Sequence, residues 1–340
     1  MGHVAPALAV AEALRRRGGL VTFAGSPDRV EARLVPEQGY EFDAFAVSGL
    51  PRRPSAELLR AAGRDLAAPA ACRRILRNRR PDAVLGAGGY VAGPMVLVAR
   101  LERIPCALTE ADAHLGLANR LAAPLADRVF LAFPVGRDGD KYRAVGRPIP
   151  ESSRPLEREE ARSRLGLAAD AQVVLVFGGS LGARLLNDLA LDAWAAEGPA
   201  VIHLCGERDY PELEGRVSRP DYILQPFMDE IGVAYGAADI VLARAGGSVW
   251  ELAAAGLPAV LVPGAFATGQ HQEKNARWFA DTGGAVVVPE AEASRSPRVV
   301  EELLGDGDRL AAMAAAMRAV AKPDAAEDIA DELVSLALRR

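Results

Sequence analysis

The sequence predicts an α/β protein built from two doubly wound domains, each with a parallel sheet. Short runs of β-branched and aliphatic residues alternate with Ala/Leu-rich stretches of helical periodicity along the chain. These runs are almost continuously apolar, as strands are when helices cover both faces of a parallel sheet. A chain of 340 residues with 50% hydrophobic content is also long enough to form two separate cores.

Strands are expected where such a run is bounded by Gly, Pro or polar residues. In the first half of the chain these runs cover 20–25, 83–89, 105–110 and 128–133. In the second half they cover 172–179, 200–206, 222–227, 239–244, 258–263 and 284–290. The first helix is expected from Pro6 to Arg17, because proline suits a first turn, arginines suit a last turn, and two glycines follow.

A proline-rich segment divides the two halves. Pro148, Pro150 and Pro155 interrupt any periodic element, and a new helical pattern begins at Glu157. We therefore expect an N-terminal domain over 1–148 and a C-terminal domain over 149–340. The last helix, about 324–340, is expected to pack back on the N-terminal domain.

Composition excludes several classes of function. The net charge of −5 argues against a nucleic-acid partner. Cys72, Cys106 and Cys205 have neither metal-ligand nor redox spacing, so each is expected to be a small buried apolar residue in a reducing compartment. With four histidines in the chain, no metal site is expected. The longest apolar run, 252–267, is interrupted by Gly and Pro and is too short to span a membrane.

The strand at 172–179 leads into the stretch FGGSLGARLLND. Gly178, Gly179 and Gly182 allow a tight turn, and the helix that follows points its free N–H groups at that turn. Such an arrangement typically binds phosphate, although a plain strand-to-helix turn is the alternative. The spacing is not that of a dinucleotide-binding loop, and no acidic residue ends the next strand. No nicotinamide cofactor is therefore expected.

The stretch ARAGGSVWELAAAG repeats this arrangement after another strand. Gly246, Gly247 and Ser248 precede a helix that bears Glu251. One interpretation is a capping box, in which Ser248 and Glu251 cap the helix reciprocally. The other is a carboxylate that accepts two hydrogen bonds from a ribose diol. The pattern alone leaves both open.

Polar side chains also follow other strands. The stretch GQHQEKNARWF places Gln270, His271, Gln272 and Asn275 near the start of a helix, where amides suit sugar hydroxyls but also suit a cap. In the first half, GAGGYVAGP is a further glycine-rich turn.

The stretch TEADAHLGLAN carries Glu110, Asp112, His114 and Asn119 after a strand. Single polar residues in such loops are usually caps. These lie at the sheet edge where open α/β folds bind ligands. Neither a nucleophile elbow nor a P-loop is present, which excludes the corresponding hydrolases and NTPases.

Five motifs together resemble one family. GHVAPALAVAEAL, GAGGYVAGPMVLVA, EADAHLGLANRLAAPLADRVFLAFP, FGGSLGARLLN and RAGGSVWELAAAGLPAVLVP…HQEKNA occur in the order typical of the MurG family. These are the bacterial N-acetylglucosaminyltransferases that act on undecaprenyl-diphospho-muramoyl-pentapeptide in peptidoglycan synthesis. The resemblance covers nearly the whole chain. It implies a GT-B fold of two facing Rossmann-like domains with an interdomain cleft, and no cofactor.

The resemblance also implies partners and site residues. UDP-GlcNAc would bind mainly to the C-terminal domain, and the undecaprenyl-linked muramoyl-pentapeptide to the N-terminal one, at the cytoplasmic face of the membrane. His3 would be the catalytic base of an inverting, metal-independent transfer to the muramoyl C4 hydroxyl. The donor-binding residues would be Gly178, Gly179, Ser180, Gly246, Ser248, Glu251, His271, Gln272 and Arg147. The acceptor-binding residues would be Tyr90, Glu110, Asp112 and Asn119.

Two segments depart from the family pattern. The hinge, 146–150, reads GRPIP where the family has Gly-Asn-Pro-Val-Arg, so a nucleotide-contacting arginine is absent from its usual place. Whether Arg147 replaces it is left open. The loop 110–113 reads EADA where the family has Glu-Gln-Asn-Ala. The departures leave room for a divergent lineage of the same enzyme or a related UDP-sugar transferase with another acceptor. A UDP-GlcNAc 2-epimerase would share the fold, but the active-site carboxylates and histidines of those enzymes are absent from the matching loops. The unusual N-terminus leaves open an inactive nucleotide-sugar-binding protein.

Two further expectations concern the N-terminal half. The stretch ACRRILRNRRPD carries five arginines that could dock on an anionic membrane surface, or simply form a solvated helix face. They are Arg73, Arg74, Arg77, Arg79 and Arg80. The chain also begins at a Gly-His turn with no strand before it. We expect Met1 to be a misassigned start, with an apolar strand and Gly-Gly-Thr encoded roughly ten to fifteen residues upstream.

Overall fold

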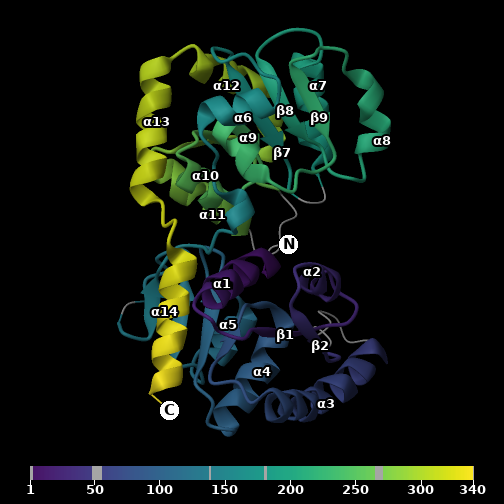
Figure 1. Ribbon diagram of the computed structural model, residues 1–340. Helices are drawn as coiled ribbons and strands as arrows, with labels where there is room; N and C mark the ends of the chain where they lie inside the picture. Colours follow the sequence, from purple (N-terminus) through teal and green to yellow (C-terminus); the bar gives the residue numbers. More distant parts are fainter. Residues whose placement is uncertain (1–2, 48–55, 138, 180–181, 265–270, 340) are drawn as a thin grey trace. The chain divides into compact units, whose positions relative to one another are not determined.

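The computed structural model describes residues 3–47, 56–137, 139–179, 182–264 and 271–339. The chain forms two compact units (Figure 1). Unit 1 comprises Met1–Pro150 together with Pro323–Arg340, and unit 2 comprises Glu151–Lys322. The chain thus leaves unit 1 at the predicted proline-rich segment and returns to it for its last helix.

Unit 2 contains a six-stranded parallel sheet in the order β12-β11-β10-β7-β8-β9. Its strands are β7 (Val173–Phe177), β8 (Ala200–Leu204), β9 (Tyr222–Gln225), β10 (Ile240–Ala243), β11 (Ala259–Leu261) and β12 (Ala285–Val287). Every strand predicted in this half is confirmed. The chain order changes direction between β7 and β10, where Phe177 pairs with Ala243. Open sheets bind ligands at such a point.

Helices cover this sheet. They are α6 (Arg158–Arg164), α7 (Arg184–Trp194), α8 (Tyr210–Leu213), α9 (Ile231–Ala237), α10 (Val249–Ala255), α11 (His271–Asp281), α12 (Ser296–Leu304) and α13 (Gly307–Val320). Trp194 of α7 and Leu303 of α12 are buried in the same apolar cluster as Val174 and Leu242 of the sheet. All five residues of β7 are buried, which explains the continuous hydrophobicity of its sequence.

The strands of unit 1 that the structure describes form two separate parallel sheets. One pairs β1 (Thr22–Gly25) with β2 (Glu41–Ala44). The other has the order β3-β4-β5-β6, with β3 (Val84–Gly86), β4 (Cys106–Glu110), β5 (Arg128–Leu131) and β6 (Tyr142–Ala144). The sequence did not predict β2 or β6. Both are short edge strands of alternating polar and apolar residues, without the apolar run that marked the others.

One helix packs against both sheets of unit 1. Unit 1 contains α1 (Val4–Arg16), α2 (Glu31–Glu37), α3 (Ala56–Arg79), α4 (Gly89–Leu101), α5 (Leu117–Ala122) and α14 (Ala325–Leu338). Ala11 of α1 is clustered with Val35 and Tyr40, next to the β1–β2 sheet. Val10 of the same helix is clustered with Phe130 of the larger sheet. The structure therefore confirms the first helix and shows it as the element common to both cores.

The last helix belongs to unit 1 through apolar and ionic contacts. Ile329 and Leu333 of α14 lie in the cluster that contains Val10 and Phe130. On its polar side Glu327 forms ion pairs with Arg16 and Arg17, and Glu332 with Arg128 and Arg143. The three cysteines are free and buried, as their spacing predicted.

A buried polar network lies at the β8–β9 edge of unit 2. His203 is fully buried, with Nδ1 2.9 Å from the Tyr222 hydroxyl and Nε2 3.0 Å from Asn187 Oδ1. The Asn187 amide donates to the Cys205 carbonyl and to Asp209, so its Oδ1 must accept from His203 Nε2–H. Nδ1 then accepts from Tyr222. His203 is neutral, and burial lowers its pKa to about 3.

This histidine makes stability depend on pH. In the unfolded chain His203 regains a pKa near 6.5, so its contribution is full above that pH and is lost as the pH falls towards 3. We predict that His203 lowers the free energy of unfolding by about 1 kcal/mol between about pH 7 and about pH 5.5. Urea unfolding at the two pH values measures it. The variant His203→Gln cannot titrate and should lose this part of the dependence; an equal fall in both proteins would contradict the prediction.

Candidate active site

The glycine loop (residues 178–182) follows the central strand of unit 2. A Cβ atom on Gly178 would overlap Ala183, and one on Gly182 would overlap the carbonyl oxygen of Cys205. Gly179 and Gly182 also have positive φ values of 95° and 73°. The loop can therefore follow this path only with glycine at these positions. Ser180, predicted to contact the donor, lies outside the described residues.

The helix after this loop begins without a side-chain cap. Its N-cap residue, Ala183, has no hydrogen-bonding side chain, and no side-chain cap bond is present there. The N–H groups of the first turn of α7 consequently face the glycine loop. Together with the helix dipole they make this end of α7 suitable for an anion such as a diphosphate.

The second glycine turn shows contacts of Ser248 and Glu251 that bear on the two interpretations. The Ser248 side chain makes no capping hydrogen bond to α10, so it does not complete the predicted capping box. Instead, Glu251 Oε2 accepts a hydrogen bond of 2.8 Å from the Tyr235 hydroxyl. Because β10 pairs directly with β7, the turn at Gly246 and the glycine loop lie at adjacent strand ends.

The start of α11 lies beside this turn. Asn275 is fully buried and its amide reaches the Ala245 carbonyl at 3.4 Å. Gln272 Oε1 accepts a 2.8 Å hydrogen bond from the N–H of Gly264. The side-chain carbonyl of Gln272 therefore binds the backbone after β11. The side-chain amide nitrogen of Gln272 is the group that can reach a ligand. His271 is the first residue of α11; Gln270 lies outside the described residues.

The sequence did not single out two residues at these strand ends. Arg244, directly after β10, donates to the Val262 carbonyl at 3.0 Å and forms an ion pair with Glu290. A charged residue that ends a buried strand is a signal that could have found it. Tyr235 of α9 is 1% exposed, and its sequence context of Gly, Ala and Val looks like ordinary core.

In unit 1, His3 and Arg147 line one small cavity. Glu110, Thr109 and Phe130 also line it. His3 is exposed as a residue, but its imidazole lies against Gly88. A Cβ atom added to Gly88 would lie 2.8 Å from Nδ1 of His3. Desolvation of the ring, and then the positive charge of Arg147, lower the His3 pKa below 6.5.

The predicted acceptor residues fall into two groups. Glu110 is buried and accepts from Gly116 N–H at 2.9 Å and from the Asn119 amide at 2.8 Å. Asn119 also donates to the Thr109 carbonyl. These two side chains hold the loop after β4 in shape. Tyr90, by contrast, is 57% exposed and can reach a large ligand; Asp112 is half-buried.

Known proteins resemble this chain over nearly its whole length. Residues 1–131 match the glycosyltransferase family 28 N-terminal domain, and residues 173–329 match the family 28 C-terminal domain. The chain is 40% identical to the UDP-N-acetylglucosamine–N-acetylmuramyl-(pentapeptide) pyrophosphoryl-undecaprenol N-acetylglucosamine transferase of Salinibacter ruber, covering 99% of this chain and 95% of the relative. The chain belongs to this family of glycosyltransferases. The enzyme of Halorhodospira halophila that carries the same name as the Salinibacter ruber relative is 41% identical to this chain. The match covers 97% of this chain and 94% of that enzyme.

Solved structures agree with the family. The structure of Acinetobacter baumannii MurG is 30% identical, with a TM-score of 0.76 over 98% of this chain and 96% of that one. The fold is therefore GT-B, as the sequence predicted. A UDP-N-acetylglucosamine 2-epimerase has a TM-score of 0.58 at 15% identity, over 94% and 96% of the two chains. That likeness concerns the fold alone, so the epimerase alternative has no support from sequence.

A titration experiment tests the effect of Arg147 on the pKa of His3. We predict that His3 titrates below pH 6.5, and that Arg147→Met raises its pKa because a nearby positive charge is removed. NMR titration of the histidine Cε1–H signals measures this, with His3→Gln to assign the signal. Arg143→Met, which removes an arginine paired with Glu332, is the control and should leave the His3 pKa unchanged. An unmoved pKa in Arg147→Met would contradict the assignment.

Proposed function

We propose that this chain transfers GlcNAc from UDP-GlcNAc to the C4 hydroxyl of undecaprenyl-diphospho-MurNAc-pentapeptide, the inverting step from lipid I to lipid II in peptidoglycan synthesis. One observation carries the proposal. A glycine loop suited to a diphosphate and a carboxylate suited to a ribose lie at adjacent strand ends, in a chain about 40% identical to transferases named for this reaction.

The donor would bind to unit 2. The glycine loop and the first N–H groups of α7 would bind the diphosphate, with Gly246 and Ser248 next to it. Glu251 would accept hydrogen bonds from both ribose hydroxyls. His271 and the amide nitrogen of Gln272 would contact the sugar hydroxyls. Arg147 lies in unit 1 beside His3, and we propose that its charge acts there on the base and on the anionic substrates.

The acceptor would bind to unit 1, where His3 is the proposed base. The muramoyl hydroxyl gives its proton to the imidazole as its oxygen attacks the anomeric carbon. The bond from that carbon to the UDP oxygen breaks, and the electron pair leaves with UDP. A lowered pKa keeps His3 neutral and able to accept a proton at pH 7. The developing negative charge on UDP would be stabilised by N–H groups of the glycine loop and α7.

An acceptor assay tests this function. The protein is incubated with labelled UDP-GlcNAc and lipid-linked muramoyl-pentapeptide, and the lipid fraction is analysed for the disaccharide. A parallel reaction with diacylglycerol tests for another lipid acceptor, and analysis for UDP-ManNAc tests for epimerisation. If neither lipid acquires the label while the protein still binds UDP, the protein binds nucleotide sugars without transferring the sugar to either lipid.

The donor assignment has its own test. Hydrogen bonds to a charged group contribute about 1.5–3 kcal/mol, so Glu251→Ala should weaken UDP binding roughly 10- to 100-fold. Isothermal titration calorimetry measures the affinity. Glu302→Ala removes a surface carboxylate that pairs with Arg298 along its own helix, and it should bind UDP normally. Unchanged affinity in folded Glu251→Ala would refute the ribose assignment.

We also propose that unit 1 docks on an anionic membrane surface. No helix among the described residues is long and apolar enough to cross a membrane, so contact would be peripheral. Leu101 of α4 and Leu117 and Leu121 of α5 are 66–72% exposed, although α4 and α5 pack together. Exposed leucines on adjacent helices are suited to the headgroup region of a bilayer.

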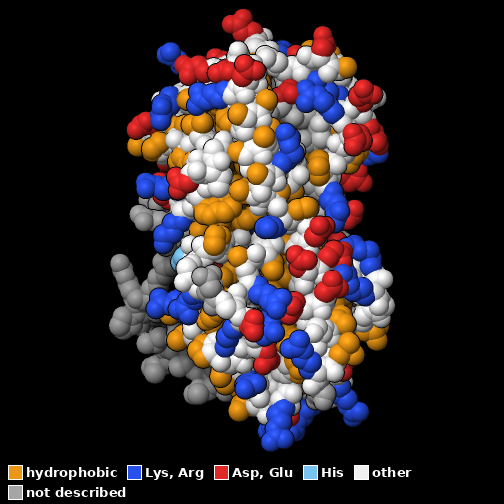
Figure 2. Space-filling view, turned by 90° about the vertical axis from the view of Figure 1, so that its left-hand side faces the viewer, with side chains coloured by type: hydrophobic (Ala, Val, Ile, Leu, Met, Phe, Trp, Pro, Cys, Tyr) orange, Lys and Arg blue, Asp and Glu red, His pale blue; other side chains and the backbone are white. Residues whose placement is uncertain are grey.

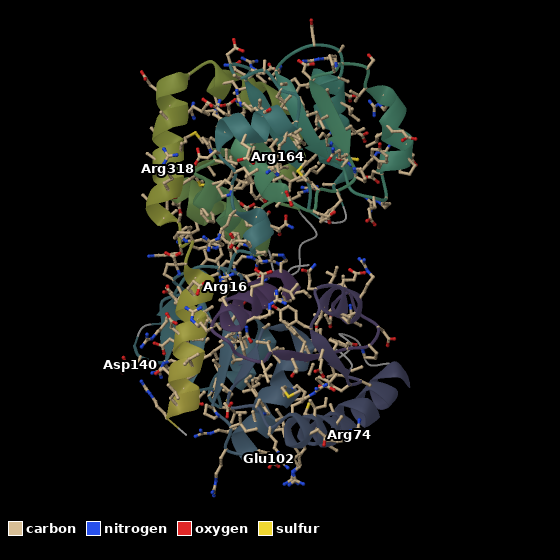
Figure 3. The ribbon with its side chains drawn as sticks, viewed as in Figure 1. Arg16, Arg74, Glu102, Asp140, Arg164 and Arg318 are labelled. Atoms are coloured by element: carbon tan, nitrogen blue, oxygen red, sulfur yellow. The ribbon has the colours of Figure 1, made fainter. Side chains whose placement is uncertain are left out.

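The predicted arginines lie near this apolar surface, but most are paired. Arg73 and Arg77 form ion pairs with Glu102, and Arg79 with Asp43 and Glu41. Basic side chains gather at the lower end of unit 1 in Figure 2, the end at which Figure 3 labels Arg74 and Glu102.

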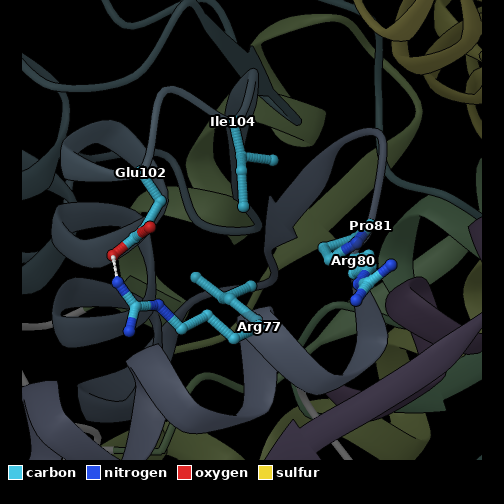
Figure 4. Close-up of a pocket in the computed structure, with 6 residues that line it drawn as sticks. Arg77, Arg80, Pro81, Glu102 and Ile104 are labelled. Carbon is cyan, nitrogen blue, oxygen red and sulfur yellow. Dashed lines mark ion pairs between the residues drawn. The ribbon is translucent and has the colours of Figure 1, made fainter.

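A pocket of about 450 Å³ lies at the same end. Arg77, Arg80, Glu102 and Ile104 line it (Figure 4). Leu76 lines it as well. The two arginines would bind the phosphate of a lipid headgroup there, with Arg77 also paired with Glu102.

Liposome co-sedimentation tests the docking surface. Leu101→Asp and Leu121→Asp should reduce binding to any liposome, while Arg74→Glu with Arg80→Glu should reduce the dependence on anionic lipid, at about 1 kcal/mol per basic residue. Leu20→Asp, at a fully exposed leucine outside α4 and α5, is the control. Binding that depends neither on anionic lipid nor on these substitutions would contradict the proposal.

A further inference from the structure

A buried hydroxyl contacts the carboxylate at the second glycine turn. Tyr235 is 1% exposed, and its hydroxyl donates to Glu251 Oε2 at 2.8 Å. The two residues come from different helices, α9 and α10. A half-buried carboxylate on a short helix has several rotamers available, and a fixed donor selects among them. The orientation of the Glu251 carboxylate therefore depends on where Tyr235 is held.

Tyr235 is held by a helix that has little freedom to shift. A Cβ on Gly232 would overlap the carbonyl oxygen of Arg154, and one on Gly236 would overlap that of Leu156. The N–H of Leu156 also donates to the Gly232 carbonyl at 3.1 Å. The backbone of α9 is thus in direct contact with the segment before α6. Small displacements of α9 are resisted by backbone contact rather than by adaptable side chains.

The same tyrosine also contacts the strand that leads to the glycine loop. The rings of Phe177 and Tyr235 have centroids 6.4 Å apart in a tilted arrangement. Phe177 is the last residue of β7 and directly precedes Gly178. One side chain therefore touches both the residue before the proposed diphosphate loop and the proposed ribose carboxylate.

We infer that Tyr235 is a positioning residue that sets the Glu251 carboxylate against the glycine loop and thereby gives the site its preference for a nucleotide with an intact ribose diol. The inference rests on the proposed function, in which Glu251 binds the ribose. It assigns Tyr235 no contact with the ligand.

The chemistry of the pair supports a permanent donor. Burial, and then the neighbouring Glu251 carboxylate, raise the Tyr235 pKa well above 10. The hydroxyl therefore keeps its proton at neutral pH. One oxygen of the carboxylate accepts the hydrogen bond from this hydroxyl, which restricts the orientation of the carboxylate relative to the strand ends. A diol can bridge a carboxylate only when both of its hydroxyls meet oxygen lone pairs in the plane of the carboxylate.

Nucleotide selectivity tests the inference. Affinities for UDP and for 2′-deoxy-UDP are measured by calorimetry on the full chain, on Tyr235→Phe, on Glu251→Ala and on the double variant. We expect Tyr235→Phe to weaken the binding of UDP about 10-fold and the binding of 2′-deoxy-UDP by less. The preference for a nucleotide with an intact ribose diol should therefore fall. The double variant should bind no more weakly than Glu251→Ala, because the hydroxyl acts only through that carboxylate.

A matched control separates positioning from stability. Tyr222→Phe removes another buried tyrosine hydroxyl of unit 2, the one paired with His203 at the β9 edge. It should lower the melting temperature and leave the ratio of UDP to 2′-deoxy-UDP affinity unchanged. If Tyr235→Phe behaves in the same way, the tyrosine is merely structural and the inference is wrong.

The outcomes also separate this inference from the proposed function. Normal UDP binding by Glu251→Ala would refute the ribose assignment itself. Weak binding by Glu251→Ala with normal binding and selectivity in Tyr235→Phe would refute only the role of the tyrosine. If Tyr235→Phe does not fold, Glu251→Asp tests the same contact. The shorter aspartate side chain would no longer reach the Tyr235 hydroxyl. Wild-type affinity and selectivity in Glu251→Asp would therefore overturn the inference.

Discussion

Direct contact between backbone segments, at positions where a side chain cannot fit, determines the geometry of unit 2. Gly182 rests on the carbonyl of Cys205, and Gly232 and Gly236 rest on the carbonyls of Arg154 and Leu156. A methyl group at any of them would separate elements that must touch. These contacts bring the glycine loop down onto β8 and hold α9 against the chain before α6.

The two units use buried charge in different ways. In unit 1 the Glu110 carboxylate is satisfied by its own loop, and Arg147 is buried beside a histidine. In unit 2 the Glu251 carboxylate accepts a hydrogen bond from the neutral Tyr235 hydroxyl. A hydroxyl orients a carboxylate without cancelling its charge, whereas an arginine in the place of Tyr235 would neutralise it.

Much of this architecture could be predicted from the sequence, because apolar runs and glycine turns report directly on parallel strands and their ends. The strands missed, β2 and β6, are edge strands whose polar alternation resembles loop. The pattern at Ser248 and Glu251 could not separate a cap from a ligand site, because both need the same spacing. Tyr235 could not be found at all: its role comes from a contact between residues 16 apart on different helices, and its neighbours in sequence are those of any core tyrosine. The family was predicted correctly because five motifs in order carry more information than any one local pattern.

The return of α14 to unit 1 has a consequence for how the chain folds during synthesis. Unit 2 is continuous in sequence, whereas unit 1 is made of the first 150 residues and a segment that follows residue 322. On the ribosome unit 2 can complete its core while unit 1 still lacks a helix. Until then the faces of α1 and β5 that Ile329 and Leu333 will cover remain open to solvent. The apolar surface of unit 1 is thus exposed for as long as unit 2 takes to emerge.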